Sequence, residues 1–205
     1  MSKKKDTFIN MVVSLFVITI ISGFSLGYVN ELTVGPIAKG KIDLSNQILG
    51  YNISDIMFSD DESILRQTNH AQVAIYIYSC IIFDIIKDID HMPVVVAGHS
   101  LGEFSALYAN NTYTFETGLQ IVNVRAKAMH RCEKNTEGKM SAVIGMSKEK
   151  ISDICKGTDT QVANINSDQQ IVISGSIESI QAVTKELKSK GAKRIIPLPV
   201  SGAFH

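Results

Sequence analysis

The chain has 205 residues, of which 20 are Lys or Arg and 20 are Asp or Glu, so its formal net charge is zero. A chain of this length can bury the core of one domain, with or without a smaller insertion. The balanced charge excludes a global electrostatic attraction to nucleic acid or to an anionic membrane. The three cysteines, Cys80, Cys132 and Cys155, show neither zinc-site spacing nor a disulfide framework. We therefore expect reduced thiols, most of which pack against other side chains.

Residues 1–30 are predicted to form a hydrophobic leader. Three lysines, Lys3 to Lys5, precede a segment without charged residues from Thr7 to Asn30. A basic start, an apolar stretch and small residues are typical of a signal peptide or signal anchor, although a buried first strand of a sheet has the same composition. Contact with a membrane is expected only through this segment. The leader favours a plastid or another organelle, with a bacterial cytoplasm as the alternative.

The next part of the chain is predicted to be mainly helical up to residue 89. Residues 45–57 and 64–66 suggest short helical or irregular pieces. The apolar segment 70–89 is too long for a strand, so we expect a buried helix in which Tyr76 and Tyr78 pack against the core.

A buried strand at Val94–Val96 is then expected to lead into Gly98-His99-Ser100-Leu101-Gly102, a G-x-S-x-G turn followed by a helix over 103–109. This pattern nominates Ser100 as a nucleophile at a strand-to-helix turn. A Cβ at Gly98 or Gly102 is expected to collide with the crossing backbone, and the N–H groups at the start of the helix would face a developing oxyanion. The alternative is an ordinary turn whose serine caps the helix. A further helix is predicted from the cap at Thr114 to about Cys132.

Residues 138–200 have a different pattern, because strands and helices alternate there. Strands are predicted in GKMSAVIGM, QVANIN, QQIVISGS and KRIIPLPV, with helices at 147–156 and 177–190, the second ending at Gly191. The order β-α-β-β-α-β is that of the split βαβ, or ferredoxin-like, motif.

Several separated motifs together resemble one enzyme family. They are GHSLGE at 98–103, the arginine of VNVRAKAM, NINSDQQIVISG and LPVSGAFH, and upstream ILGYNISDIMF and LRQTNHAQVAIY. From about Gln47 to His205 the sequence resembles the malonyl-CoA:acyl carrier protein transacylases of type II fatty acid synthesis. The resemblance implies an α/β fold: a hydrolase-like parallel sheet core with a nucleophile elbow, plus an inserted ferredoxin-like α+β subdomain. The expected domains are an incomplete acyltransferase core at 45–134, the subdomain at 135–200 and a return to the core at 201–205.

The resemblance also implies roles for single residues. Ser100 would take malonyl from coenzyme A as an ester, His205 would move the proton, and Arg125 would hold the malonyl carboxylate with its planar guanidinium. Leu101 would supply an oxyanion-hole N–H, and Leu101 and Phe204 together would favour malonyl over methylmalonyl. The remaining positions expected to contact substrate or line the pocket are Gln72, His99 and Asn166. The implied partners are malonyl-CoA as substrate and an acyl carrier protein. The enzyme is expected to be a monomer without a bound cofactor or metal.

The sequence departs from the family pattern at both ends. Family members open with a GQGSQ loop, whose glutamine is a second oxyanion-hole donor, and continue well beyond the histidine, whereas this sequence has no glutamine before Gln47 and ends at His205. The alternative hypothesis is therefore a truncated, catalytically impaired fragment or pseudoenzyme. An α/β-hydrolase esterase is a further alternative, with Asp153 or Asp159 as the acid, but the sequence lacks the expected HGGG loop.

Overall fold

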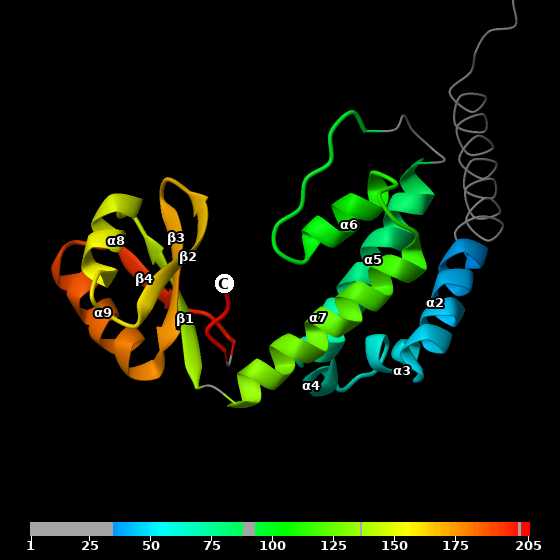
Figure 1. Cartoon of the computed structure of the whole chain (residues 1–205), viewed down its shortest axis with the longest axis horizontal. Coiled ribbons are helices and arrows are strands. Elements are labelled where there is room, and N and C mark those ends of the chain that lie inside the picture. The colour runs from blue at the N-terminus through cyan, green and yellow to red at the C-terminus, as the bar shows by residue number, and fades with distance from the viewer. Residues whose placement is uncertain (1–34, 88–92, 136, 201) are drawn as a thin grey trace, which may run out of the picture. The chain divides into compact units, whose positions relative to one another are not determined.

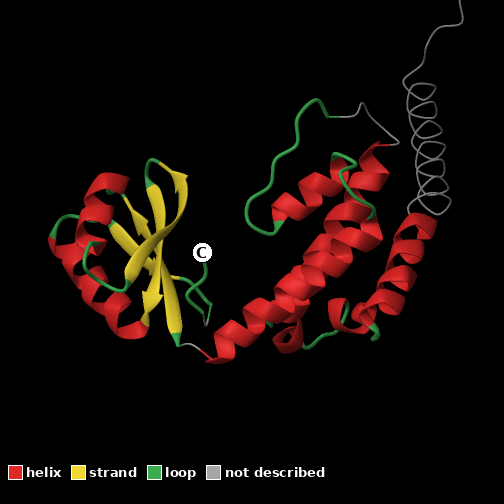
Figure 2. Ribbon diagram, viewed as in Figure 1, coloured by secondary structure: helices red, strands yellow, loops and turns green. Residues whose placement is uncertain are grey.

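The computed structural model describes residues 35–87, 93–135, 137–200 and 202–205, and the predicted leader at 1–30 lies outside them. The chain divides into two compact units, residues 1–123 and 124–205. Figure 1 labels the elements along the chain, and Figure 2 shows the helices and the sheet. Each unit is described by itself.

The described residues of the first unit form helices and no strand. The longest of them, α5, confirms the helix predicted in the apolar segment, and α7, which begins in this unit and continues into the second, confirms the helix predicted after Thr114. Thr114 accepts a hydrogen bond from the N–H of Thr117 at 3.3 Å and so caps the start of α7. The helices are α2 (Gly35–Leu49), α3 (Ile53–Met57), α4 (Glu62–Leu65), α5 (Thr68–Lys87), α6 (Gly102–Ala109) and α7 (Phe115–Asn135).

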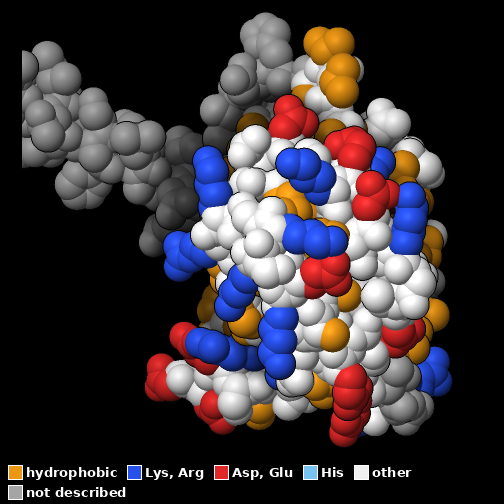
Figure 3. Space-filling model, turned by 90° about the vertical axis from the view of Figure 1, so that its left-hand side faces the viewer, with side chains coloured by type: hydrophobic (Ala, Val, Ile, Leu, Met, Phe, Trp, Pro, Cys, Tyr) orange, Lys and Arg blue, Asp and Glu red, His pale blue; other side chains and the backbone are white. Residues whose placement is uncertain are grey.

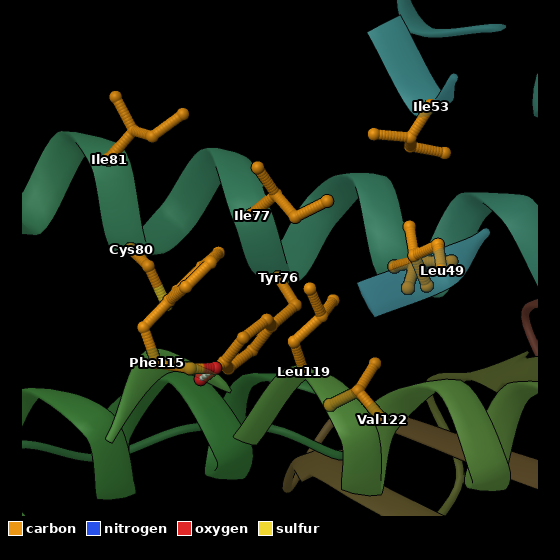
Figure 4. Packing of buried hydrophobic residues seen from close by; sticks show 10 residues of the cluster. Leu49, Ile53, Tyr76, Ile77, Cys80, Ile81, Phe115, Leu119 and Val122 are labelled. Carbon is orange, nitrogen blue, oxygen red and sulfur yellow. Dashed lines mark hydrogen bonds between the residues drawn. The ribbon is translucent and has the colours of Figure 1, made fainter. Parts of the chain in front are cut away.

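The core of the first unit surrounds α5: Tyr76 and Cys80 point toward α7, whereas Ile77 and Ile81 point to the opposite side of the helix (Figure 4). The ring of Tyr76 on α5 stacks on that of Phe115 on α7, with centroids 5.8 Å apart. By length and composition α5 resembles a membrane-crossing helix, but core helices of soluble proteins have the same properties, and 44% of its most apolar window is buried. The buried cluster consists of Leu49, Ile53, Val73, Tyr76, Ile77, Cys80, Ile81, Phe115, Leu119 and Val122.

Two predictions about apolar residues of this unit are wrong. Val94 and Val95 are not in a buried strand: residues 93–97 have no strand structure, and the two side chains are 100% and 80% exposed. A strand exists only where another strand pairs with its backbone N–H and C=O groups, and the described part of the first unit supplies none. Tyr78 does not pack in the core either, since it is 60% exposed while Tyr76 is fully buried.

A polar network joins α2, α5 and α6 beside this core. The ammonium of Lys41 lies 2.9 Å from the Asp84 carboxylate and donates to the Tyr108 hydroxyl, also at 2.9 Å. Tyr108 in turn donates to the carboxylate of Asp84, and Lys87 forms a second ion pair with it at 2.9 Å. The side chains of Lys41 and Asp84 are only 14% and 10% exposed. Burial alone would raise the pKa of Asp84, but the hydrogen bonds from Lys41, Lys87 and Tyr108 outweigh it and lower the pKa.

We expect Asp84→Asn to lower the free energy of unfolding by about 3–5 kcal/mol, because it leaves the buried Lys41 ammonium without a counter-charge. The matched control is Asp153→Asn, which removes an exposed ion pair with Lys156 and should cost less than about 1 kcal/mol. Urea unfolding monitored by circular dichroism measures both. If the two variants are equally stable, the network does not stabilise the unit.

The same carboxylate makes stability depend on pH. Because the folded-state pKa of Asp84 is lowered, its contribution is complete above the ordinary Asp pKa of about 3.9 and is lost as pH falls through the folded-state value. The difference in stability between the wild type and Asp84→Asn should therefore shrink as pH falls below about 4.

The second unit contains a four-stranded antiparallel sheet. Its strands are β1 (Gly138–Ile144), β2 (Thr160–Ser167), β3 (Gln170–Ser176) and β4 (Arg194–Pro197), in the order β2-β3-β1-β4. Two helices, α8 (Lys148–Cys155) and α9 (Ile177–Ser189), connect them. This order and the two crossover helices are those of the predicted split βαβ motif. Gly191, with φ of 97°, ends α9 as predicted.

The two faces of this sheet carry separate apolar clusters. One face packs against α8 and α9 through fully buried side chains that include Val143, Ile151 and Leu187. On the other face, Met140, Ala142 and Val172 are covered by the segment that follows β4. Leu198 anchors this segment by donating its N–H to the Met140 carbonyl at 3.0 Å. The end of the chain is thereby held against the sheet.

Candidate active site

The turn around Ser100 has the geometry expected of a nucleophile elbow. Ser100 has φ of 53°, a left-handed conformation that is uncommon for residues other than glycine and costs conformational energy. The turn closes through hydrogen bonds from the N–H of Gly102 to the His99 carbonyl at 2.9 Å and from Glu103 to the Ser100 carbonyl at 3.3 Å. A strained serine directly before a helix is the part of a nucleophile elbow that the structure shows, while the strand that precedes such a turn is not formed at 93–97.

The two glycines of the turn have different roles. A Cβ at Gly98 would overlap the backbone of Gly102 and Glu103, so only glycine fits there. A Cβ at Gly102 would meet nothing within 4 Å. The prediction of a collision is therefore right for Gly98 and wrong for Gly102, because Gly102 starts α6 and its Cβ would point away from the turn.

The start of α6 offers N–H groups close to the serine. The N-cap position is Leu101, whose side chain makes no capping hydrogen bond. Leu101, and not Ser100, therefore occupies the N-cap position of α6. Among the residues described, no hydrogen bond uses the N–H of Leu101. An unpaired N–H at a helix N-terminus is the kind of donor that stabilises negative charge on a substrate oxygen.

The remaining candidates of the first unit lie on either side of this turn. His99 is exposed, and Leu101 is half-buried against the helical core. Gln72 lies near the start of α5 and is 7% exposed. Ser100, His99 and Leu101 are thus brought together by one turn, while Gln72 belongs to the neighbouring helix, since α5 and α6 pack against each other.

The second unit contains the other four candidates. Arg125 is half-buried on α7, and Asn166 is exposed near the end of β2. Phe204 packs on the sheet face that carries Met140, while His205 is exposed and has φ of 60°. His205 is thus exposed, while Phe204 directly before it is held in an apolar cluster on the sheet.

His205 borders a cavity of about 250 Å³ at one end of the sheet. Glu137 and Asp159 also line this cavity. Of the two acids considered for an esterase, Asp159 thus lies in the cavity with His205, whereas Asp153 pairs with Lys156 at 2.6 Å on the surface. No group of three or more His, Cys, Asp or Glu suited to a metal ion occurs in the described ranges. The other lining residues are Gln161, Ser174, Gly175, Ser176 and Ala203.

Sequence reasoning missed two features of these sites. It did not foresee that Glu137 lies in the same cavity as His205, because the contact depends on the return of the chain after β4. It also missed the Lys41–Asp84–Tyr108 network, although a single carboxylate within the apolar run IIFDII is a signal for a buried ion pair. Nothing in the sequence identifies Lys41 as its partner.

Comparison with known proteins places this fold and turn in a family. Residues 36–205 match the family described as "Acyl transferase domain". The chain belongs to this acyl transferase family. A malonyl CoA-acyl carrier protein transacylase of Synechocystis is 36% identical over 176 residues, which are 85% of this chain and 58% of the relative. The transacylase of Staphylococcus aureus COL is 37% identical over 162 residues, covering 77% of this chain and 52% of the relative.

Solved structures agree with this membership. The structure of MCAT from Streptococcus pneumoniae matches with a TM-score of 0.77 at 36% identity, covering 86% of this chain and 58% of that one. The expected fold class, an α/β acyltransferase fold with a small ferredoxin-like subdomain, is confirmed by these neighbours, as is the resemblance to the transacylases. Another neighbour at 29% identity is a transacylase in complex with a type II polyketide acyl-carrier protein. The acyltransferase chain described here spans a little more than half the length of these relatives.

Proposed function

We propose that this acyltransferase chain moves a malonyl group from malonyl-CoA to the phosphopantetheine thiol of an acyl carrier protein. Ser100 Oγ attacks the thioester carbonyl, the C–S bond breaks, and coenzyme A leaves as its thiol while malonyl remains as a serine ester. The carrier thiol then attacks the ester and releases Ser100. The observation that carries this proposal is the left-handed Ser100, held between Gly98 and the start of α6.

His205 is proposed as the base and acid of both steps. A serine hydroxyl is a poor nucleophile at neutral pH and needs an imidazole to take its proton. The same imidazole then returns the proton to the leaving thiolate. The proposal requires His205 to reach Ser100 Oγ during the reaction. The anchoring of Phe204 against the sheet supports this role, because it limits the motion of the adjacent histidine.

The negative charge that develops on the carbonyl oxygen needs hydrogen-bond donors. The Leu101 N–H at the start of α6 is the donor that we assign to it. Each such donor is worth about 2.7–4 kcal/mol of transition-state stabilisation. His99, Gln72 and Asn166 are proposed to line the pocket rather than to transfer protons, and Phe204 to restrict the room beside the acyl group.

A basic part of the second unit suits an anionic partner. Figure 3 shows Lys and Arg side chains on one face of this unit, with Asp and Glu between them. Around the end of α9 and the start of β4, four cationic side chains are exposed and take part in no ion pair among the described residues. They are Lys185, Lys188, Lys193 and Arg194. Both coenzyme A and the phosphopantetheine of a carrier bear phosphate, so such a surface would attract either.

The test is transfer to a carrier. The purified chain, malonyl-CoA and a phosphopantetheine-bearing carrier are mixed, and malonyl-carrier is measured by mass spectrometry. We expect malonyl-carrier to form with the wild type and not in the absence of the chain. Release of free malonate without malonyl-carrier would instead indicate the esterase alternative and would contradict the proposal.

Arg125 provides a prediction about acyl selectivity. If its guanidinium holds the malonyl carboxylate, Arg125→Ala should slow malonyl transfer by about 10- to 100-fold, since a hydrogen bond to a charged group contributes about 1.5–3 kcal/mol. Transfer from acetyl-CoA, which has no carboxylate, should change much less. The matched control is Arg131→Ala, an exposed arginine on the same helix. Equal losses with both acyl groups would show that Arg125 does not select malonyl.

A further inference from the structure

The cavity that His205 borders is built by the second unit alone. Its volume is about 250 Å³, and all of its lining residues lie between Glu137 and His205 in the chain. Two strands of the sheet contribute to it, β2 through Gln161 and β3 through Ser174, which is 7% exposed. A polar cavity beside a sheet is a place where one side chain can be held in one orientation.

A glycine at position 138 lets the segment that carries His205 lie directly on the start of β1. A Cβ at Gly138 would lie 2.5 Å from the backbone nitrogen of Ala203, closer than a real side chain could lie. Glu137 directly precedes Gly138, and His205 follows Ala203 by two residues. The close approach of the two backbones therefore brings Glu137 near His205, and both residues line the cavity.

Asp159, the second acidic residue of the cavity, is held by a different contact. A Cβ at Gly175 would overlap the carbonyl oxygen of Asp159, so the backbone before β2 lies against β3 at this point. Asp159 thus belongs to the edge of the sheet that β2 forms, whereas Glu137 precedes β1, the strand on which Ala203 lies. Of the two acidic residues, Glu137 is the one whose backbone position is tied to that of His205.

An imidazole that acts as a base needs an acceptor for its other ring nitrogen. A neutral histidine carries hydrogen on one ring nitrogen and a lone pair on the other. A carboxylate that accepts from the N–H fixes the lone pair on the opposite nitrogen, and it stabilises the imidazolium that forms when the proton arrives. The hydroxyls of Ser174 and Ser176 could accept the same hydrogen bond, but they carry no charge that would stabilise the imidazolium.

We propose that Glu137 is a positioning residue for His205. Its carboxylate accepts a hydrogen bond from one ring N–H of His205 and leaves the other ring nitrogen to take the proton of Ser100. The kinetic consequence rests on the proposed function of Ser100 and His205, whereas the contact itself lies within the second unit. Glu137 exchanges no proton with the substrate and acts through the imidazole.

The contact is tested by nitrogen NMR of the full chain labelled with ¹⁵N-histidine, without substrate and at about pH 8.5, where imidazoles are neutral. The spectrum of His205→Gln identifies the signals of His205. In the wild type we expect one tautomer of His205 to predominate, and in Glu137→Ala we expect the two tautomers to be mixed. The matched control Asp159→Ala removes the other acidic side chain of the cavity and should leave the His205 signals unchanged.

The kinetic consequence is tested by the rate of malonyl transfer to the carrier. Glu137→Ala should lower kcat about tenfold, the effect of losing one hydrogen bond to a charged group, and should leave KM for malonyl-CoA within about twofold. Glu137→Gln keeps an acceptor oxygen without the charge and should lose less. Asp159→Ala should transfer malonyl at the wild-type rate.

The proposal is overturned if the His205 signals are the same in the wild type and in Glu137→Ala, or if Asp159→Ala changes them as much. It is also overturned if an active Glu137→Ala protein keeps the wild-type kcat or differs from the wild type only in KM. A chain whose His205 tautomer depends on Glu137 but that forms no malonyl-carrier would contradict the proposed function and leave this contact standing.

Discussion

Replacing Ser100 with alanine is expected to reduce malonyl transfer by about 10⁴-fold or more, because Ser100 is the group that we propose to form the ester intermediate. Ser100 has φ of 53° and lies directly before α6, next to the Leu101 N–H that we assign to the substrate oxygen. Initial rates of carrier malonylation at matched protein concentration give the measurement. Circular dichroism should show an unchanged fold.

The control for this substitution is five residues further along the chain. Ser105 lies on α6, which follows the turn, and its Oγ is buried with no hydrogen-bond partner within the described part of the chain. Removing a buried hydroxyl that makes no hydrogen bond costs little, so Ser105→Ala should retain nearly full activity. If Ser100→Ala keeps more than a tenth of the wild-type rate, Ser100 is not the nucleophile.

Gly98→Ala is expected to lower the transfer rate by about 100-fold or more, because the new methyl group would overlap the backbone of Gly102 and Glu103. The turn can relieve this overlap only by moving Ser100, and a displacement of about 1 Å at a reacting atom costs a factor of this size. Overpacking should also cost about 1–3 kcal/mol in the free energy of unfolding. The rate and the urea midpoint are measured on the same preparation.

Gly102→Ala is the control, because it tests whether any alanine in this turn lowers the transfer rate and the stability, or only one at Gly98. A Cβ at Gly102 meets no atom within 4 Å, and alanine favours the first turn of a helix over glycine. The variant should therefore fold at least as stably as the wild type and remain active. Equal damage from both substitutions would mean that the turn does not have the geometry described.

The secondary structure of the second unit could be predicted closely because each element has its own local sequence pattern. The short apolar runs in β1 and β3, the amphipathic pattern of α9 and the glycine after it each specify one element. The β-α-β-β-α-β order then leaves few ways to pair the strands, so the observed order of the sheet could be predicted.

The first unit was harder to predict because its features depend on distant parts of the chain. The apolar run at 93–97 has the composition of a buried strand, but a strand needs a neighbour, and composition alone does not report one. Tyr76 and Tyr78 lie two positions apart on a helix, so they point in different directions, and only one of them reaches the core. The packing of α2 on α5, which brings Lys41 to Asp84, has no signature within either segment.

The candidate site was predictable to the extent that its residues share a motif. Ser100, His99 and Leu101 lie in one pentapeptide, whose turn could be inferred from the glycines. The difference between Gly98 and Gly102 could not, because it depends on where the backbone crosses. The roles of Arg125 and His205 stay predictions that rest on the family pattern and on the experiments proposed above.

The most direct test of Ser100 as the nucleophile is the location of the acyl group. The wild-type chain is incubated with malonyl-CoA, digested under mildly acidic conditions that preserve esters, and mapped by tandem mass spectrometry. We expect a malonyl ester on Ser100 in the peptide that contains GHSLGE, and no such ester in the Ser100→Ala protein. A folded chain that carries malonyl only at another residue, or carries none, would contradict this role of Ser100.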